Sequence, residues 1–271
     1  MDGYLMVIGW SLIGSILSLI GGVLLLSFTK WRRPVIDVAM PFGAGAMLSA
    51  AFLGMIPEAL HDSETVSIML FVMGGFLVFF LLERLLGWFH HHEQHHHDGV
   101  HGKRDATHRS LVVIGDTLHN AIDGVAIGVS FLVSPTVGVG TALAVALHEV
   151  PQEIGDFGIL LGKGMKPRKV LLVNVLSSLV AVLTAVGAYA LGSRFQIDPA
   201  PLLAIAAGMF IYVAASDLIP DIHEQPRRKG SLQAAMLFVG VIVIGLVVLS
   251  KPHDHDVSTL RMDEVASLDR L

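Results

Sequence analysis

Long apolar segments constrain this chain more than any other feature of its sequence. Residues 231–250 (SLQAAMLFVGVIVIGLVVLS) carry no charged side chain. A bilayer core of about 30 Å needs about 20 apolar residues of helix to cross it. A soluble helical bundle does not suit such a segment, because a helix on the surface of a soluble protein needs a polar face. The segment therefore predicts a transmembrane helix.

Seven further segments have a similar length and hydropathy, so the chain is predicted to cross a membrane eight times. The composition agrees, since 53% of the residues are hydrophobic and only 15% are charged. The first segment is too long for a signal peptide and is preceded by Asp2 instead of a basic region. The transport domain is expected to occupy residues 1–250. The predicted spans are 4–28, 35–57, 67–89, 110–133, 137–161, 169–192, 201–220 and 231–250.

Lysine and arginine residues gather in alternate connections, which sets the expected orientation. Of the 18 basic residues, 14 lie in or beside the connections that follow spans one, three, five and seven, whereas the connections between them hold only Arg194. Basic residues mark the cytoplasmic side of a membrane protein. Both termini are therefore expected outside, with the loop 90–109 in the cytoplasm and 251–271 as an extracytoplasmic tail. The compact chain favours a bacterial inner membrane.

Two of the predicted spans resemble each other although they run in opposite directions. Span two contains GAMLSAAFLGMIPEAL (45–60), and span seven contains GMFIYVAASDLIPDIH (208–223). In register, Gly45 matches Gly208, and the Ile-Pro-Glu of span two matches the Ile-Pro-Asp of span seven. Such a similarity is the expected trace of an inverted repeat, which is common in secondary transporters.

A second pair of similar segments lies at the centre of the chain. Span four contains HNAIDG (119–124), and the oppositely directed span five contains HEVPQE (148–153). The predicted fold class is therefore all-α: a polytopic membrane protein with eight transmembrane helices, arranged as an inverted repeat of 3+2+3 helices with both termini outside.

Polar side chains in these central spans are placed deep in the membrane. His119 lies about 14 Å from one end of span four, and His148 lies about 17 Å from the opposite end of span five, at 1.5 Å per residue. Both imidazoles therefore reach the midplane. Residues i and i+4 share a helix face, which pairs His119 with Asp123 and His148 with Gln152. Ionisable groups at this depth usually mark an ion path, and this ligand set suits a cation such as zinc. The alternative is a hydrogen-bonded seam that stabilises the bundle.

The segments HNAIDGVAIGVSF (119–131) and HEVPQEIGDFGILL (148–161) resemble the fourth- and fifth-span signatures of the ZIP family of divalent-metal transporters. They are most similar to its histidine-rich branch, whose fifth-span motif reads HExPHExGD. The resemblance extends to the eight-span plan, the outward termini and the histidine-rich third loop.

The resemblance implies uptake of Zn²⁺, or of Fe²⁺, Mn²⁺ or Cd²⁺, into the cytoplasm, with no cofactor beyond the transported metal and with a homodimer as the assembly. It implies one metal on His119, Asp123, His148 and Gln152, with Asn120 and Glu149 at a second or bridging position. The chain departs from the branch at Gln152, where the motif has His. A neutral amide is a weaker zinc ligand, so affinity or selectivity is expected to differ.

Other polar residues are weaker candidates, and ordinary solvation explains many of them as well. Glu153 and Asp156 form a stripe with Glu149 on span five, while Asn174 and Ser177 lie where some family members carry a span-six glutamate. An entry site is predicted at Glu58 and His61, and a cytoplasmic exit at Asp217, Asp221 and His223. Metal capture is predicted for the loop histidines, for which a flexible linker is the alternative: His90, His91, His92, His95, His96 and His97.

Two other functions compete with metal uptake. The His148-Glu149 pair begins an HExxH motif, which in an intramembrane metalloprotease would bind zinc, but Gln152 replaces the second histidine. A cation exporter of the diffusion-facilitator type also uses His and Asp at i, i+4, but such proteins typically have six spans and a cytoplasmic domain. No enzymatic activity is expected. The chain has no cysteine and a net charge of −5, so thiolate sites are excluded and nothing suggests nucleic acid.

Overall fold

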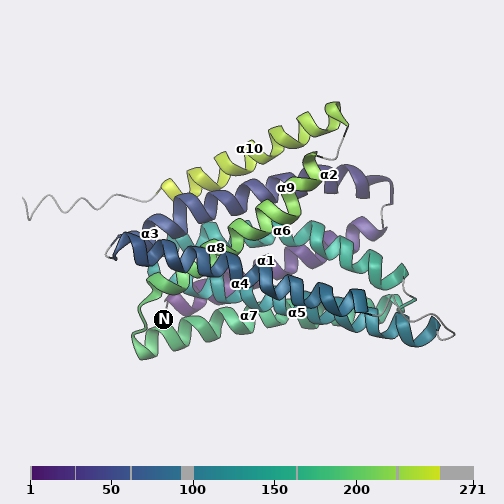
Figure 1. Ribbon diagram of the computed structural model, residues 1–271, viewed down its shortest axis with the longest axis horizontal. Helices are drawn as coiled ribbons and strands as arrows, with labels where there is room; N and C mark the ends of the chain where they lie inside the picture. The colour runs from purple at the N-terminus through teal and green to yellow at the C-terminus, as the bar shows by residue number, and fades with distance from the viewer. Residues whose placement is uncertain are drawn as a thin grey trace, which may run out of the picture.

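The computed structural model describes residues 2–27, 29–61, 63–92, 101–162, 164–223 and 226–250. Throughout these ranges the regular structure is helical, and the long helices lie side by side along one axis (Figure 1). This confirms the all-α prediction. The helices are α1 (Asp2–Ser27), α2 (Thr29–Ser49), η1 (Ala50–Met55), α3 (Ile56–Leu60), α4 (Thr65–His92), α5 (His101–Val133), α6 (Pro135–Gly162), α7 (Pro167–Phe195), α8 (Pro199–Val213), η2 (Ala214–Leu218), α9 (Ile219–His223) and α10 (Arg227–Leu249).

Seven helical stretches within the described ranges are long and apolar enough to cross a membrane, so the chain is a multi-pass membrane protein. The helix α6 is also long enough, since its 28 residues extend about 42 Å. It is not among the seven, and the polar residues between His148 and Asp156 interrupt its apolar run. The predicted count of eight spans therefore depends on α6 and stays a prediction.

The helices α4 and α5 extend into the segment predicted as the loop 90–109. The helix α4 ends at His92 and α5 begins at His101. Residues 103–109 contain neither proline nor glycine, so nothing in that stretch interrupts a helix. Residues 93–100, with His95, His96 and His97, lie outside the described residues.

A π-helical segment precedes the proline in predicted spans two and seven, whose sequences resemble each other. The segment η1 leads into Ile56-Pro57, and η2 leads into Ile219-Pro220. Proline cannot donate to the carbonyl four residues earlier, and its ring displaces that carbonyl. The wider π turn accommodates this displacement within an otherwise continuous helix.

The aligned glycines of these two spans serve the same packing role. A Cβ atom on Gly45 would lie 2.0 Å from the carbonyl oxygen of Leu237 in α10, and one on Gly208 would lie 1.9 Å from that of Val72 in α4. Neither position can therefore hold a larger residue without moving a backbone. The shared role supports an inverted repeat, which stays a prediction.

The helices form two groups that meet at the centre of the molecule. In one group α5 packs most closely on α7 and α6 packs on α1, and in the other α2 packs on α10 and α4 packs on α8. The helix α6 also contacts α2 and α10, so it lies between the groups. The polar residues of α5 and α6 are therefore placed in the interior and not towards lipid.

The connections lie at two ends of the bundle. Those between α1 and α2, α4 and α5, α6 and α7, and α9 and α10 lie at one end, on the right of Figure 1. We call this the basic end, because its connections follow the first, third, fifth and seventh predicted spans, where the lysines and arginines gather. The N-terminus and the end of α10 lie at the opposite end. The cytoplasmic assignment of the basic end stays a prediction.

Candidate metal centre

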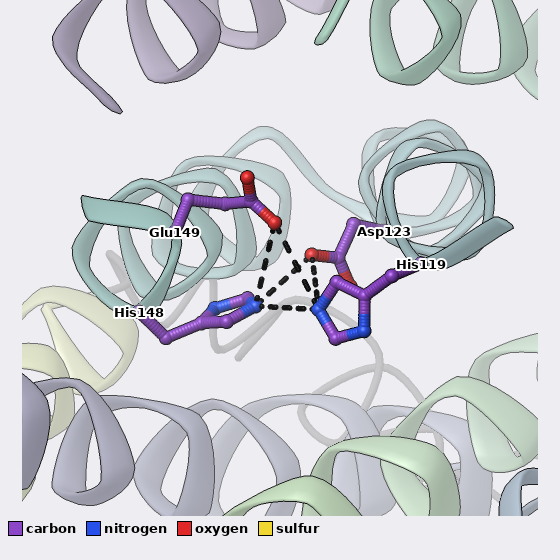
Figure 2. A group of neighbouring side chains, drawn as sticks. All are labelled: His119, Asp123, His148 and Glu149. Atoms are coloured by element: carbon purple, nitrogen blue, oxygen red, sulfur yellow. Dashed lines mark hydrogen bonds and ion pairs between the residues drawn. The ribbon is translucent and has the colours of Figure 1, made fainter. Parts of the chain in front are cut away.

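The imidazoles of His119 and His148 meet in the middle of the bundle. Their Nε2 atoms are 3.1 Å apart, although one ring comes from α5 and the other from α6 (Figure 2). His148 is only 2% exposed and His119 is partly buried. The two rings therefore face each other and not the lipid, as the antiparallel arrangement of these helices predicted.

Two carboxylates complete the group. The Oδ2 atom of Asp123 is 3.5 Å from His119 Nε2 and 3.1 Å from His148 Nε2. The Oε1 atom of Glu149 is 3.8 Å from both of these nitrogens. All four donor atoms lie within 4.8 Å of one another. Each helix thus contributes one imidazole and one carboxylate to a common centre (Figure 2).

The spacing of the four atoms fits a tetrahedrally bound cation. Bonds of about 2.0–2.1 Å, as zinc makes to nitrogen and oxygen, place neighbouring ligand atoms about 3.3 Å apart. The distances of 3.1–3.8 Å given above bracket this value. Asp123 Oδ2 and Glu149 Oε1 are also buried without a hydrogen-bond partner. Buried carboxylate oxygens without a partner are costly, and a cation between them would compensate for both.

The backbone of α6 fixes the ring of His148. Its Nδ1 atom lies 3.1 Å from the carbonyl oxygen of Ala144, one turn earlier. A carbonyl oxygen only accepts, so Nδ1 carries the proton and donates it in this contact. The lone pair of Nε2 is then directed at the centre, which is the arrangement that metal-binding histidines use.

Residues of neighbouring helices pack against both histidines. The ring of Phe79 in α4 packs edge-on against His119, with centroids 5.8 Å apart, and Phe210 in α8 lies 6.4 Å from the ring of His148. A Cβ atom on Gly43 in α2 would lie 3.0 Å from His148 Cα. Since α2, α4 and α8 all contact the centre, its shape depends on how the two helix groups meet.

A pocket of about 270 Å³ adjoins the centre, and Gln152 is one of the residues that line it. It begins at the two histidines and extends along the first half of α2, the end of α8 and η2, towards the basic end. Gln152 therefore lies beside the imidazoles and next to the open space. The lining residues are Ile36, Met40, His119, His148, Gln152, Val213 and Leu218.

Asn120 is hydrogen-bonded to Asp116 and Ser177. Its Nδ2 atom donates to Asp116 Oδ1 at 3.0 Å, to the backbone oxygen of Asp116 at 3.1 Å and to Ser177 Oγ at 3.3 Å. Sequence reasoning missed Asp116, which is 7% exposed. Its position four residues before Asn120, on the same helix face, was the signal that could have identified it.

The weaker candidates on α6 and α7 do not belong to the group formed by His119, Asp123, His148 and Glu149. Glu153 is fully buried and accepts a hydrogen bond from Ser178 Oγ at 3.2 Å, while its Oε2 atom has no partner. Asn174 donates to the backbone oxygen of Val170 at 2.8 Å. Asp156 is partly buried. The group of four donor atoms includes none of these side chains.

The predicted entry residues line a second pocket at the end opposite the basic end. Glu58 and His61 share this space of about 420 Å³ with Asp198, which the sequence reading had not singled out. The side chains of the predicted exit residues Asp217, Asp221 and His223 are outside the part of the chain that the structure describes. The same is true of the side chains of His90, His91 and His92 in the histidine-rich loop.

The chain is similar to known metal transporters. It is 38% identical over 154 residues to Zinc transporter ZIP10 of Mus musculus, 39% over 125 residues to Metal cation symporter ZIP14 of Homo sapiens, and 35% over 141 residues to Zinc transporter foi of Drosophila melanogaster. These segments cover 51%, 45% and 51% of the chain but only 18%, 25% and 20% of the relatives. The chain therefore corresponds to a minor part of each of these longer proteins.

A family model covers far more of the chain. The model described as ZIP Zinc transporter matches residues 4–110 and 89–248, which extend from the first turn of α1 to the last turn of α10. Together with the relatives, this match shows that the chain belongs to the ZIP zinc transporter family.

Proposed function

We propose that this protein transports divalent metal ions across a membrane and that the ion binds between His119, Asp123, His148 and Glu149. The observation that carries the proposal is the group of four nitrogen and oxygen atoms within 4.8 Å, which lies among membrane-spanning helices. Two imidazoles and two carboxylates suit zinc, and they also accept iron, manganese or cadmium. The names of the relatives, two zinc transporters and a metal cation symporter, support this class of substrate.

The positions of Gln152 and Asn120 extend the proposed site in two directions. Gln152 shares the 270 Å³ pocket with both histidines, so it is placed to contact the ion as the ion enters or leaves this space. Asn120 follows His119 directly and belongs to the network with Asp116 and Ser177. We propose that its amide oxygen contributes to a second or bridging position, as the resemblance implies.

The pocket suggests which side has access to the site in this conformation. It extends from the histidines towards the basic end, whereas the 420 Å³ pocket at the opposite end contains neither histidine. On that opposite side the buried side chains of Met47, Ala51 and Phe210 pack in the core. If the basic end is cytoplasmic, as its charges predict, the site is open inwards. Alternating access would then import the ion by opening the other side first.

Three observations favour transport over proteolysis. Gln152 occupies the position that the second histidine has in an HExxH motif. Glu149 contributes Oε1 to the group of four donor atoms, whereas a catalytic base would lie beside the metal ligands. All three named relatives are transporters or symporters. Export remains the competing function, because the same metal ligands could serve transport in either direction.

A flux measurement tests the proposal. Purified protein would be reconstituted in liposomes that contain a zinc indicator, and Zn²⁺ would be added outside. Indicator fluorescence is expected to rise faster than in protein-free liposomes, and Fe²⁺, Mn²⁺ or Cd²⁺ should compete with Zn²⁺. Cells that express the protein should accumulate zinc; net loss would indicate export. Equal rates with and without protein would refute transport.

A further inference from the structure

Asn120 belongs to a buried hydrogen-bonded network. Asn120 and Asp116 are 3% and 7% exposed and occupy successive turns of α5. Asn120 Nδ2 donates to two oxygen atoms of Asp116, at 3.0 and 3.1 Å, and to Ser177 Oγ of α7 at 3.3 Å. Three buried side chains from two helices are thereby joined.

This network admits only one orientation of the amide. A backbone carbonyl and a carboxylate accept hydrogen bonds and donate none. If the amide of Asn120 were turned over, its oxygen would face both of these acceptors with no hydrogen between them. The nitrogen must therefore lie towards Asp116, and the oxygen is the end of the amide that the network leaves unused.

The orientation matters because only one end of an amide can bind a metal ion. The oxygen has lone pairs, whereas the nitrogen carries two hydrogens and is a donor. Along α5, Asp116 lies one turn before Asn120 and the ligand Asp123 lies three residues after it. We infer that Asp116 is a positioning residue that turns the Asn120 amide so that its oxygen serves the transported ion. This inference rests on the proposed function.

Asp116 itself is not a member of the metal group. The four donor atoms come from His119, Asp123, His148 and Glu149. Asp116 instead uses Oδ1 and its backbone oxygen on Asn120. Its effect on the ion should therefore be transmitted through Asn120, and it should depend on the ability of residue 116 to accept a hydrogen bond and not on its charge.

Two substitutions at residue 116 separate these roles, with Co²⁺ as the probe. Co²⁺ binding to the full chain in detergent would be followed through its visible absorption bands. Asp116→Ala removes the side-chain acceptor and is expected to weaken Co²⁺ binding by about 10- to 100-fold, as is typical for partners of metal ligands. Asp116→Asn keeps an acceptor oxygen and should bind nearly as wild type. Thr117→Val is the matched control, because the hydroxyl of Thr117 donates within its own helix, to the backbone oxygen of Val113.

A double-mutant cycle with Asn120→Ala completes the test. Asp116→Ala should cause no further loss of affinity once Asn120 has been replaced. The inference is overturned if Asp116→Asn is as damaging as Asp116→Ala, if the two losses add, or if either Asp116→Ala or Asn120→Ala binds as wild type.

A further variant covers the case in which Asp116→Ala does not fold. Ser177→Ala removes one acceptor of the same network and should weaken Co²⁺ binding to a smaller extent, with no effect in the Asn120→Ala background. A Ser177→Ala protein with wild-type affinity then overturns the inference. Failure of the proposed function looks different, since the wild-type protein itself would not bind Co²⁺.

Discussion

His119 and His148 are 29 residues apart in sequence, yet their Nε2 atoms lie 3.1 Å from each other at the junction of α5 and α6. Two neutral nitrogens at this distance either share a proton or bind a common cation. The adjacent oxygens of Asp123 and Glu149, both buried without a hydrogen-bond partner, favour the cation. The pair therefore provides the most direct test of the proposed site.

Replacement of either histidine by alanine is expected to abolish uptake. Each substitution removes one of the four donor atoms and leaves two buried carboxylates with a single imidazole. Zinc flux into proteoliposomes would be measured beside Leu118→Ala, a control at an exposed position of α5. Expression and elution volume should match wild type. Flux that persists in both histidine variants would show that the ion binds elsewhere.

Replacement of Gln152 by histidine is expected to tighten zinc binding or to change the metal preference. The side chain shares a pocket with His119 and His148, and an imidazole is a stronger zinc ligand than a neutral amide. Competition between Zn²⁺ and Mn²⁺ during uptake would measure the change in preference. Identical competition curves for the variant and the wild type would place residue 152 away from the ion.

Acidification is expected to weaken metal binding. The nitrogens of His119 and His148 bind a cation only when they are unprotonated, and protons compete with the metal for them. Affinity should therefore be highest at neutral or alkaline pH and decrease as the pH falls through the range in which histidine becomes charged, about pH 8 to 5. Zn²⁺ affinity measured across this range would test the direction, which a constant affinity would contradict.

Replacement of Gly43 by valine is expected to disturb the site through the backbone. A Cβ atom at this position would lie 3.0 Å from His148 Cα, so α2 and α6 would have to separate. Overpacking of this kind costs about 1–3 kcal/mol. We expect a lower melting temperature together with weaker Zn²⁺ binding.

Gly74→Val provides the control for this change, because a Cβ atom at Gly74 in α4 would meet nothing within 4 Å. It introduces the same side chain into a membrane helix without the contact. If both variants bound Zn²⁺ equally well, close packing of α2 on His148 would be unimportant for the site.

Replacement of the loop histidines between His90 and His97 by serine is expected to change the efficiency or the regulation of transport without abolishing it. None of these residues belongs to the four-residue centre that the structure describes. Uptake rates over a range of external Zn²⁺ concentrations would be compared with wild type. Complete loss of uptake would mean that this loop is part of the transport path.

Much of this architecture could be predicted from the sequence because lipid imposes strict requirements. Segments such as 231–250 can only be membrane helices, and their number and charge pattern restrict the topology. The polar residues at mid-depth were equally informative, since a histidine there is costly without a partner. The i, i+4 spacing of His119 and Asp123 placed both side chains on one helix face, and the structure finds them 3.5 Å apart.

Tertiary structure decided which polar groups meet across helices. The sequence ranked Gln152 beside the histidines and Glu149 as a flanking residue, whereas the helix rotation brings Glu149 Oε1 within 3.8 Å of both imidazoles. One hydrogen-bond partner of Asn120 is Ser177, which lies 57 residues away in sequence, on α7. Helical periodicity specifies the direction of a side chain relative to its own axis. The azimuth and separation of neighbouring helices are set by packing, as where Gly43 allows α2 to approach His148.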